Sequence, residues 1–153
     1  MNWDEYFFNI VRTISVKSKD PSTNVGCVVV SQNNEVVSTG FNGFPRGVED
    51  NVSTVPERYE RELKLMFTEH AERNAIYAAA RRGVVLDGCR IYVEWNPCAD
   101  CMRAIIQSGI REVILNGRSE SFNNQELRKR WENHILCAES MAREAGVKIR
   151  IWN

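Results

Sequence analysis

Three side chains that bind zinc, with a carboxylate beside them, stand in two short segments of the sequence. His70 is followed by Glu72, and Cys98 is followed three positions later by Cys101. Zinc takes imidazole nitrogen and thiolate sulfur as ligands, and a catalytic zinc with three protein ligands keeps its fourth position open for water. A carboxylate near that water can take its proton and pass it to a substrate. We therefore predict one zinc per chain, held by His70, Cys98 and Cys101, with Glu72 as the proton carrier.

A closed structural zinc site is the main alternative to this prediction. Such a site needs a fourth ligand, which Cys27, Cys89, Cys137 or His134 could supply. Structural zinc sites are typically built from paired Cys-x-x-Cys or His motifs, so the spacing here favours an open site. We expect the three remaining cysteines in the core and His134 on the surface or at the edge of the core. Glu72 as an ordinary surface carboxylate is the corresponding alternative for the proton carrier.

The metal ligands are expected at the starts of two helices. Thr68 can cap a helix that runs to about Arg82, and Gly83 can end it. A second helix should run from Pro97 through Ser108. Both helix N-termini would then direct their positive ends toward the metal, and this lowers the pKa of the cysteine thiols.

The rest of the chain alternates between helical and extended patterns. We expect further helices over residues 3–17, 56–67 and about 131–145, and strands over residues 25–30, 35–39, 90–93, 113–115 and 147–151. Each strand after the first hairpin is followed by a helix, which favours parallel pairing of the later strands. The pattern predicts one α/β domain over residues 1–153, with a mixed five-stranded sheet between helices on both faces, a three-layer α/β/α arrangement.

Charge and composition disfavour several classes of protein. The 153 residues carry 20 Lys plus Arg and 20 Asp plus Glu, so the basic excess that a partner of long nucleic acid usually needs is absent. No apolar run approaches the roughly 20 residues of a membrane span. The acidic N-terminal residues do not resemble a signal peptide, and five cysteines are typical of cytosolic thiols and metal ligands. We therefore expect a cytoplasmic protein.

Two pairs of motifs resemble a known family. Residues 70–76 (HAERNAI) with 97–101 (PCADC) are similar to the cytidine/deoxycytidylate deaminase superfamily, whose signature is H-x-E followed by P-C-x-x-C. Residues 18–26 (SKDPSTNVG) and 40–47 (GFNGFPRG) narrow the resemblance to deoxycytidylate (dCMP) deaminases. The zinc motif is shared by the whole superfamily, so the two loop motifs discriminate more. The resemblance extends from Trp3 to Val147 and implies a cytidine-deaminase-like fold.

The resemblance implies a reaction and its regulation. The family hydrolyses dCMP to dUMP and ammonia, which supplies dUMP for thymidylate synthesis. Zinc activates the water that attacks C4 of cytosine, while Glu72 would protonate N3 and then pass a proton to the leaving amine. The family also implies a homo-oligomer, a hexamer, with dCTP as activator and dTTP as inhibitor.

The resemblance also implies residues that bind the substrate. Asn42 matches a family Asn over the sugar and base, and the backbone N–H of Ala71 matches a contact to the pyrimidine O2. Lys19 and Thr23 are candidates for the 5′-phosphate, and Arg46 for a nucleotide phosphate at the active or the regulatory site. The alternatives are that Lys19 and Arg46 are solvated charges and that Asn42 only forms a turn.

The chain departs from the family pattern in two places. Glu94-Trp95-Asn96 replaces the usual Thr-x-aromatic before Pro-Cys and is similar to the Trp-Ser-Pro-Cys of polynucleotide cytidine deaminases. We predict Trp95 as a wall of the base pocket, with plain core packing as the alternative. Residues 48–68 contain no Cys and no His, so no second zinc is expected there.

Other functions stay open at this point. Another nucleotide or base, such as dCTP or guanine, could be the substrate, and a tRNA adenosine deaminase shares the sheet. A zinc scaffold that only senses nucleotides is a further alternative, although it has no need of Glu72. Tyr59, Leu63 and Met66 form an apolar stripe that should pack inward or onto a neighbouring subunit.

Overall fold

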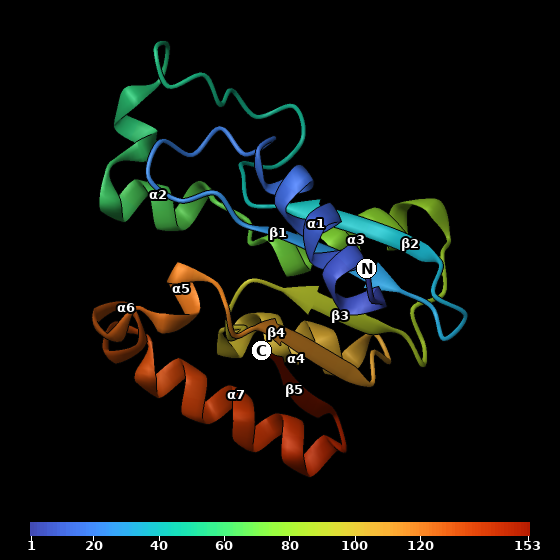
Figure 1. Ribbon diagram of the computed structural model, residues 1–153. Helices are drawn as coiled ribbons and strands as arrows, with labels where there is room; N and C mark the ends of the chain where they lie inside the picture. Colours follow the sequence, from blue (N-terminus) through green and yellow to red (C-terminus); the bar gives the residue numbers. More distant parts are fainter.

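A five-stranded mixed sheet forms the middle of the molecule (Figure 1). In the computed structural model, which describes residues 1–153, the strand order is β2-β1-β3-β4-β5. Strand β1 (Gly26–Val30) pairs antiparallel with both β2 (Val36–Phe41) and β3 (Arg90–Val93). Strands β4 (Glu112–Asn116) and β5 (Lys148–Trp152) continue from β3 in parallel. The predicted mixed sheet with parallel last strands is confirmed.

One face of the sheet is covered by helix α1 (Trp3–Ser15) (Figure 1). Its Phe7 and Phe8 are fully buried and pack on side chains of β3 and β5. The Phe8 and Trp152 rings stack with their centroids 5.0 Å apart. Asn2 caps the helix by accepting a hydrogen bond from the Glu5 N–H at 2.8 Å, as its sequence position favours.

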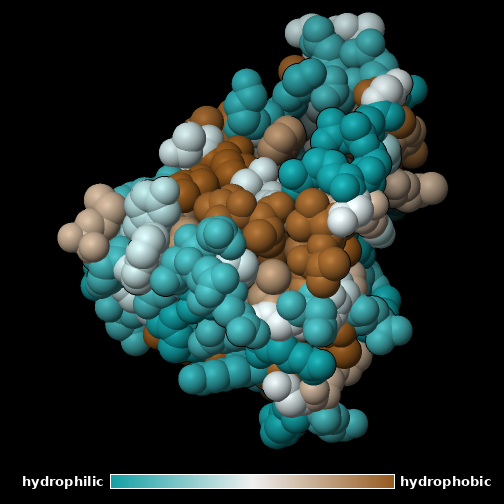
Figure 2. All heavy atoms as spheres, turned by 90° about the vertical axis from the view of Figure 1, so that its right-hand side faces the viewer, coloured by the Kyte–Doolittle hydropathy of each residue, from teal (hydrophilic) through white to brown (hydrophobic).

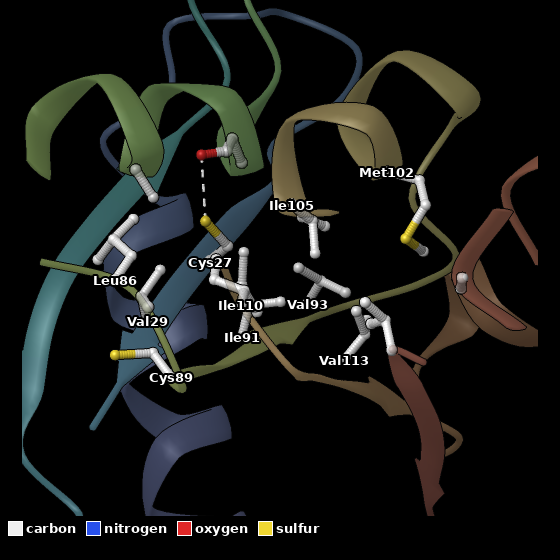
Figure 3. Packing of buried hydrophobic residues seen from close by; sticks show 14 of the residues in the cluster. Cys27, Val29, Leu86, Cys89, Ile91, Val93, Met102, Ile105, Ile110 and Val113 are labelled. Atoms are coloured by element: carbon white, nitrogen blue, oxygen red, sulfur yellow. Dashed lines mark hydrogen bonds between the residues drawn. The ribbon is translucent and has the colours of Figure 1, made fainter. Parts of the chain in front are cut away.

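The opposite face carries helices α3 (Ala71–Arg82), α4 (Ala99–Gln107) and α7 (Glu132–Ala145). Figure 3 shows apolar side chains from α4 and from several strands meeting in this core, Met102 and Ile105 among them. Helices on both faces give the predicted three-layer arrangement. The parallel strands β3 and β4 are buried on both faces, which explains their unbroken apolar runs.

The segment between β2 and α3 differs from the expectation. Residues 56–67 were expected to form one helix, but a 3-10 helix (η1, Pro56–Tyr59) is followed by a separate α2 (Arg61–Phe67). Glu60 between them is extended, with ψ at 145°. A helix cannot pass through an extended residue, so the chain turns at this point.

The predicted start of α3 is also wrong. The helix begins at Ala71, and the residue at its N-cap is His70 rather than Thr68. Glu69 exchanges two backbone hydrogen bonds with Gly43, at 2.8 and 3.1 Å, and this pairing keeps the preceding residues extended. The Thr68 hydroxyl is buried without a partner. The end of the helix is as predicted, with Gly83 in the left-handed region at φ 68°.

Two short helices after β4 were not expected. They are α5 (Glu120–Asn123) and α6 (Gln125–Arg130), and Ser119 and Asn124 cap them by accepting backbone N–H groups. They bring the start of α7 to the same end of the sheet as the starts of α3 and α4. None of the helices combines the length and the apolar character that crossing a bilayer requires.

Candidate active site

The three predicted zinc ligands lie together at the N-termini of α3 and α4. His70 is the N-cap of α3, Cys98 is the N-cap of α4, and Cys101 lies in the first turn of α4. The His70 Nδ1 is 3.5 Å from the Cys98 Sγ and 3.4 Å from the Cys101 Sγ. All three ligand atoms lie within 4.8 Å of one another.

This geometry suits tetrahedral zinc. With Zn–N near 2.0–2.1 Å and Zn–S near 2.3 Å, a tetrahedral angle places nitrogen and sulfur roughly 3.5 Å apart. The two His–Cys distances match this value. Hydrogen bonds to Cys101 and His70 hold the pKa of the Cys98 thiol well below its usual range. A group that deprotonates readily is prepared for metal binding.

Glu72 lies beside this cluster, two residues into α3. It is only 6% exposed and lines the same cavity as His70 and Cys98. Burial raises the pKa of its carboxyl, and the charge of His70 opposes that shift. The carboxyl therefore takes up a proton more readily than a solvated glutamate does.

The first turn of α3 is held directly against the sheet. Cys27 of β1 donates a hydrogen bond to the Ala71 carbonyl at 3.1 Å, drawn as the dashed line in Figure 3, and Ser38 of β2 donates to the Ala75 carbonyl at 2.7 Å. A Cβ at Gly40 would lie 2.1 Å from the Ala71 oxygen, so only glycine allows this approach. The sheet thereby fixes the position of Glu72.

A cavity of about 1010 Å³ opens in front of the cluster. Five residues predicted to bind or transform the substrate line it, together with His70 and Cys98 of the metal cluster: Thr23, Asn42, Ala71, Glu72 and Trp95. The volume lies at the upper end of the range for small-molecule sites.

Asn42 is fixed by the backbone around it. Its side chain is buried, its Oδ1 accepts the Val25 N–H at 2.8 Å, and its Nδ2 donates to the Thr23 carbonyl at 2.8 Å. A carboxamide has two donor hydrogens and two acceptor lone pairs. One of each therefore remains available to a ligand in the cavity.

Two of the predicted phosphate ligands lie elsewhere. Lys19 forms an ion pair with Asp50 at 2.7 Å, its side chain is 64% exposed, and it lines a separate cavity of about 290 Å³. Arg46 is exposed and lines neither cavity. Of the three phosphate candidates, only Thr23 reaches the large cavity.

Helix α2 contributes cations to the cavity that the sequence analysis did not predict. Lys64 lines the cavity and contacts the Asp20 Oδ2 at 2.8 Å and the Ser22 Oγ at 2.6 Å. Arg61, one turn earlier, also lines the cavity and forms no ion pair. The chain turns at the extended Glu60 just before α2, and the charge pattern alone does not reveal that this helix then faces the cavity.

The remaining cysteines and His134 occupy ordinary positions. Cys27 and Cys89 are buried as expected, but Cys137 is exposed on α7, so its predicted core position is wrong. His134 is exposed as expected, and its Nδ1 accepts the Ala99 N–H at 3.4 Å. None of these side chains belongs to the metal cluster.

Comparison with known proteins finds a matching family and several similar proteins. The model of the cytidine and deoxycytidylate deaminase zinc-binding region matches residues 1–117. An uncharacterized deaminase in the luxG 3′ region of Aliivibrio fischeri is 41% identical over 147 residues, which are 96% of this chain and 91% of the relative. Deoxycytidylate deaminase of Mus musculus is 36% identical over 152 residues, 98% of this chain and 79% of the relative.

A solved structure shares the fold. It is the crystal structure of dCMP deaminase from the cyanophage S-TIM5 in complex with dCMP and dUMP, which matches with a TM-score of 0.72 at 23% identity. The match covers 97% of this chain and 95% of the phage protein. The match of the family model to most of the chain, together with the His–Cys–Cys cluster, shows that this chain belongs to the cytidine and deoxycytidylate deaminase family and carries its zinc-binding region.

Proposed function

We propose that this protein hydrolyses dCMP to dUMP and ammonia and so supplies dUMP for thymidylate synthesis. The observation that carries the proposal is Glu72, a buried carboxylate beside a three-ligand zinc cluster in the wall of a large cavity. A zinc scaffold that only senses nucleotides needs no such carboxylate. Relatives named deoxycytidylate deaminase, in Mus musculus and Homo sapiens, support the choice of substrate.

In this proposal His70, Cys98 and Cys101 hold the zinc, which supplies the Lewis acidity that makes water a nucleophile at neutral pH. Glu72 takes a proton from the attacking water and delivers it to N3 of cytosine as the C4–O bond forms. It then takes the remaining proton from the oxygen bound to C4 and delivers it to the amino group, and ammonia leaves as the C4–N bond breaks and the C4 carbonyl forms. Its raised pKa suits a group that must both accept and donate.

The neighbouring residues position the nucleotide. Ala71 is the first residue of α3, so its backbone N–H lacks a helical partner and is free to bind the pyrimidine O2. Asn42 would use its remaining donor and acceptor for the sugar. Trp95 would form a wall of the base pocket.

We place the 5′-phosphate near Thr23 and the α2 cations. Lys64 is already paired with Asp20, whereas Arg61 has no carboxylate partner and is available to a ligand in the cavity. Lys19 and Arg46 lie outside the cavity and are not assigned to the substrate phosphate. Arg46 stays a candidate for an effector phosphate.

Ammonia release from dCMP, CMP, dCTP, deoxycytidine and tRNA tests the substrate. A charge-assisted contact contributes about 1.5–3 kcal/mol, so kcat/KM should fall at least about tenfold from dCMP to deoxycytidine. Arg61→Gln should reduce this preference, while the matched Arg46→Gln should preserve it. Equal efficiency on dCMP and deoxycytidine would remove the phosphate site, and a preference for tRNA would replace the proposed substrate.

The same proposal includes how the subunits assemble, how nucleotides regulate the activity and where in the cell the protein acts. We propose a homo-oligomer, a hexamer, with dCTP as activator and dTTP as inhibitor. Leu63, Leu65 and Met66 support it, since they are 38%, 63% and 81% exposed on α2 in a single chain. A cytoplasmic location is supported by five cysteines that form no disulfide.

A further inference from the structure

An aromatic side chain from outside the family motif lies next to the metal cluster. Trp131 stands between α6 and α7, beyond residues 1–117 that the family model matches, and its side chain lines the large cavity. Its ring centroid is 6.3 Å from that of His70 and 6.2 Å from that of Trp95, with interplanar angles of 73° and 84°. Two indoles at nearly right angles therefore form a corner next to a metal ligand.

This corner is held rigidly to the helix that carries the cysteines. Trp131 ends α6 through its N–H to the Leu127 carbonyl at 3.1 Å and begins α7 by accepting the Ile135 N–H at 2.9 Å. Ile135 itself is buried, and α7 packs on α4. His134 accepts the Ala99 N–H, which joins the first turn of α7 to the first turn of α4. Trp131 thus keeps a fixed position relative to Cys98.

The corner is apolar in a cavity whose other walls are largely polar and charged. Asp20, Arg61, Lys64 and Glu94 line the same space and offer charged partners to a phosphate and a sugar. Indole rings pack favourably against flat heteroaromatic rings, edge-to-face or offset. The part of a nucleotide that fits the corner is the base, and the base must also approach the metal cluster to react.

We propose that Trp131 contacts the base of the bound nucleotide and, together with Trp95, selects a flat nucleobase for the metal cluster. The proposal rests on the proposed function and adds to it a specificity residue from the C-terminal part of the chain. The contact acts on the base alone. Removing it should therefore weaken the binding of nucleotides and leave the binding of a sugar phosphate, which has no base, unchanged.

Calorimetric binding of dUMP and of deoxyribose 5-phosphate to the zinc-loaded protein tests the proposal. An aromatic pair contributes binding free energy beyond its buried area. Trp131→Ala should therefore raise the Kd for dUMP roughly five- to tenfold and leave the Kd for deoxyribose 5-phosphate unchanged. Trp131→Phe keeps an aromatic ring and should bind dUMP nearly as wild type, with a smaller change of tryptophan fluorescence on binding. Trp3→Phe is the matched control, because Trp3 is 55% exposed on α1 and stacks on Phe7. It should keep the full fluorescence change.

Zinc content, measured in every variant, separates a base contact from damage to the site. Unchanged dUMP affinity in Trp131→Ala would overturn the proposal, as would an equal loss for both ligands or a full fluorescence change in Trp131→Phe. If the wild-type protein binds dUMP through Trp131 but releases no ammonia from dCMP, the proposed reaction fails and the base contact stands.

Discussion

Glu72 is the residue on which the proposed catalytic role of the zinc site depends, and it is buried beside the metal cluster. A glutamate in solution is ionised at neutral pH, but burial raises the pKa of this carboxyl. Acid–base catalysis works best when the pKa approaches the working pH. The position of Glu72 also depends on Gly40, because the close approach of β2 to α3 brings the first turn of the helix against the sheet.

We predict that Glu72→Gln keeps the fold and the zinc but loses nearly all turnover. General acid–base catalysis contributes about 10²–10⁴-fold, and Glu72 is assigned both proton transfers. Steady-state ammonia release and metal analysis check this, with Cys101→Ala as the companion variant that should lose zinc. Turnover by Glu72→Gln within about threefold of wild type would contradict the assignment.

Among the site residues, the sequence predicts the metal ligands best. His70, Cys98 and Cys101 come together because each lies at the start of a helix, and the sequence predicts both helices although it gives the wrong N-cap for α3. Lys19 was misplaced because the direction of a long flexible side chain depends on its partner, here Asp50, which is 31 residues away. Trp131 stands at the start of the helix predicted over about 131–145, and nothing in the local sequence indicates that its ring lies beside His70.

The elements follow the sequence where local patterns and tertiary packing agree. Strand β3 matches its predicted bounds, and β1 matches within one residue, since β-branched apolar runs suit buried strands. The segment from residue 43 to residue 69 departs from its pattern because its two ends pair with each other as an isolated bridge. That pairing forces the chain before α3 to stay extended, and helix propensity cannot anticipate it.

The ion pair between Asp20 and Lys64 joins the loop before β1 to α2. Asp20 is 7% exposed in the loop before β1, and it accepts hydrogen bonds from Lys64 of α2 and from the Ser22 and Thr23 backbone. Burial raises the pKa of its carboxyl, but the hydrogen bonds from Lys64 and Ser22 outweigh it and the net pKa is lowered. Because Thr23 holds Asn42, this tie also positions a proposed substrate ligand.

We predict that Lys64→Met lowers the free energy of unfolding at pH 7 by about 2 kcal/mol, the scale of hydrogen bonds to charged groups. A carboxyl whose folded pKa is lowered contributes stability above its unfolded pKa, near 3.8 here, and loses it as the pH falls through the folded value. The difference between wild type and Lys64→Met should therefore shrink as the pH drops toward about 4 and below.

Urea unfolding at several pH values measures this difference, and comparing both proteins at each pH cancels the loss of zinc common to them. Lys19→Met is the control, because its pair with Asp50 is exposed and should leave stability unchanged. A difference that stays constant from pH 7 into the acid range would contradict the role of the Asp20 carboxylate.

The whole molecule presents apolar surface on two sides. Helix α2, at the left of Figure 1, exposes Leu65 and Met66. The opposite side, seen in Figure 2, carries hydrophobic residues gathered in the middle of a hydrophilic border. Two separate apolar surfaces on one chain suit an assembly with two kinds of interface, as a hexamer of paired trimers has.

We predict a hexamer that dCTP activates, and the two halves of this prediction depend on the same segment. The loop from Gly40 to Gly47 carries Asn42 into the cavity and leads toward α2, so a subunit packed on α2 would bear on the loop. An effector held at Arg46 would shift activity only if it binds one arrangement of that loop better than another. Light scattering, with dCMP saturation curves measured with and without dCTP, tests both halves, and Met66→Glu should weaken the assembly while the matched Leu136→Glu, exposed on α7, should not. A monomer at micromolar protein would refute the assembly. A hyperbolic curve that dCTP leaves unchanged, or only inhibits competitively, would refute the regulation while the chemistry at Glu72 stands.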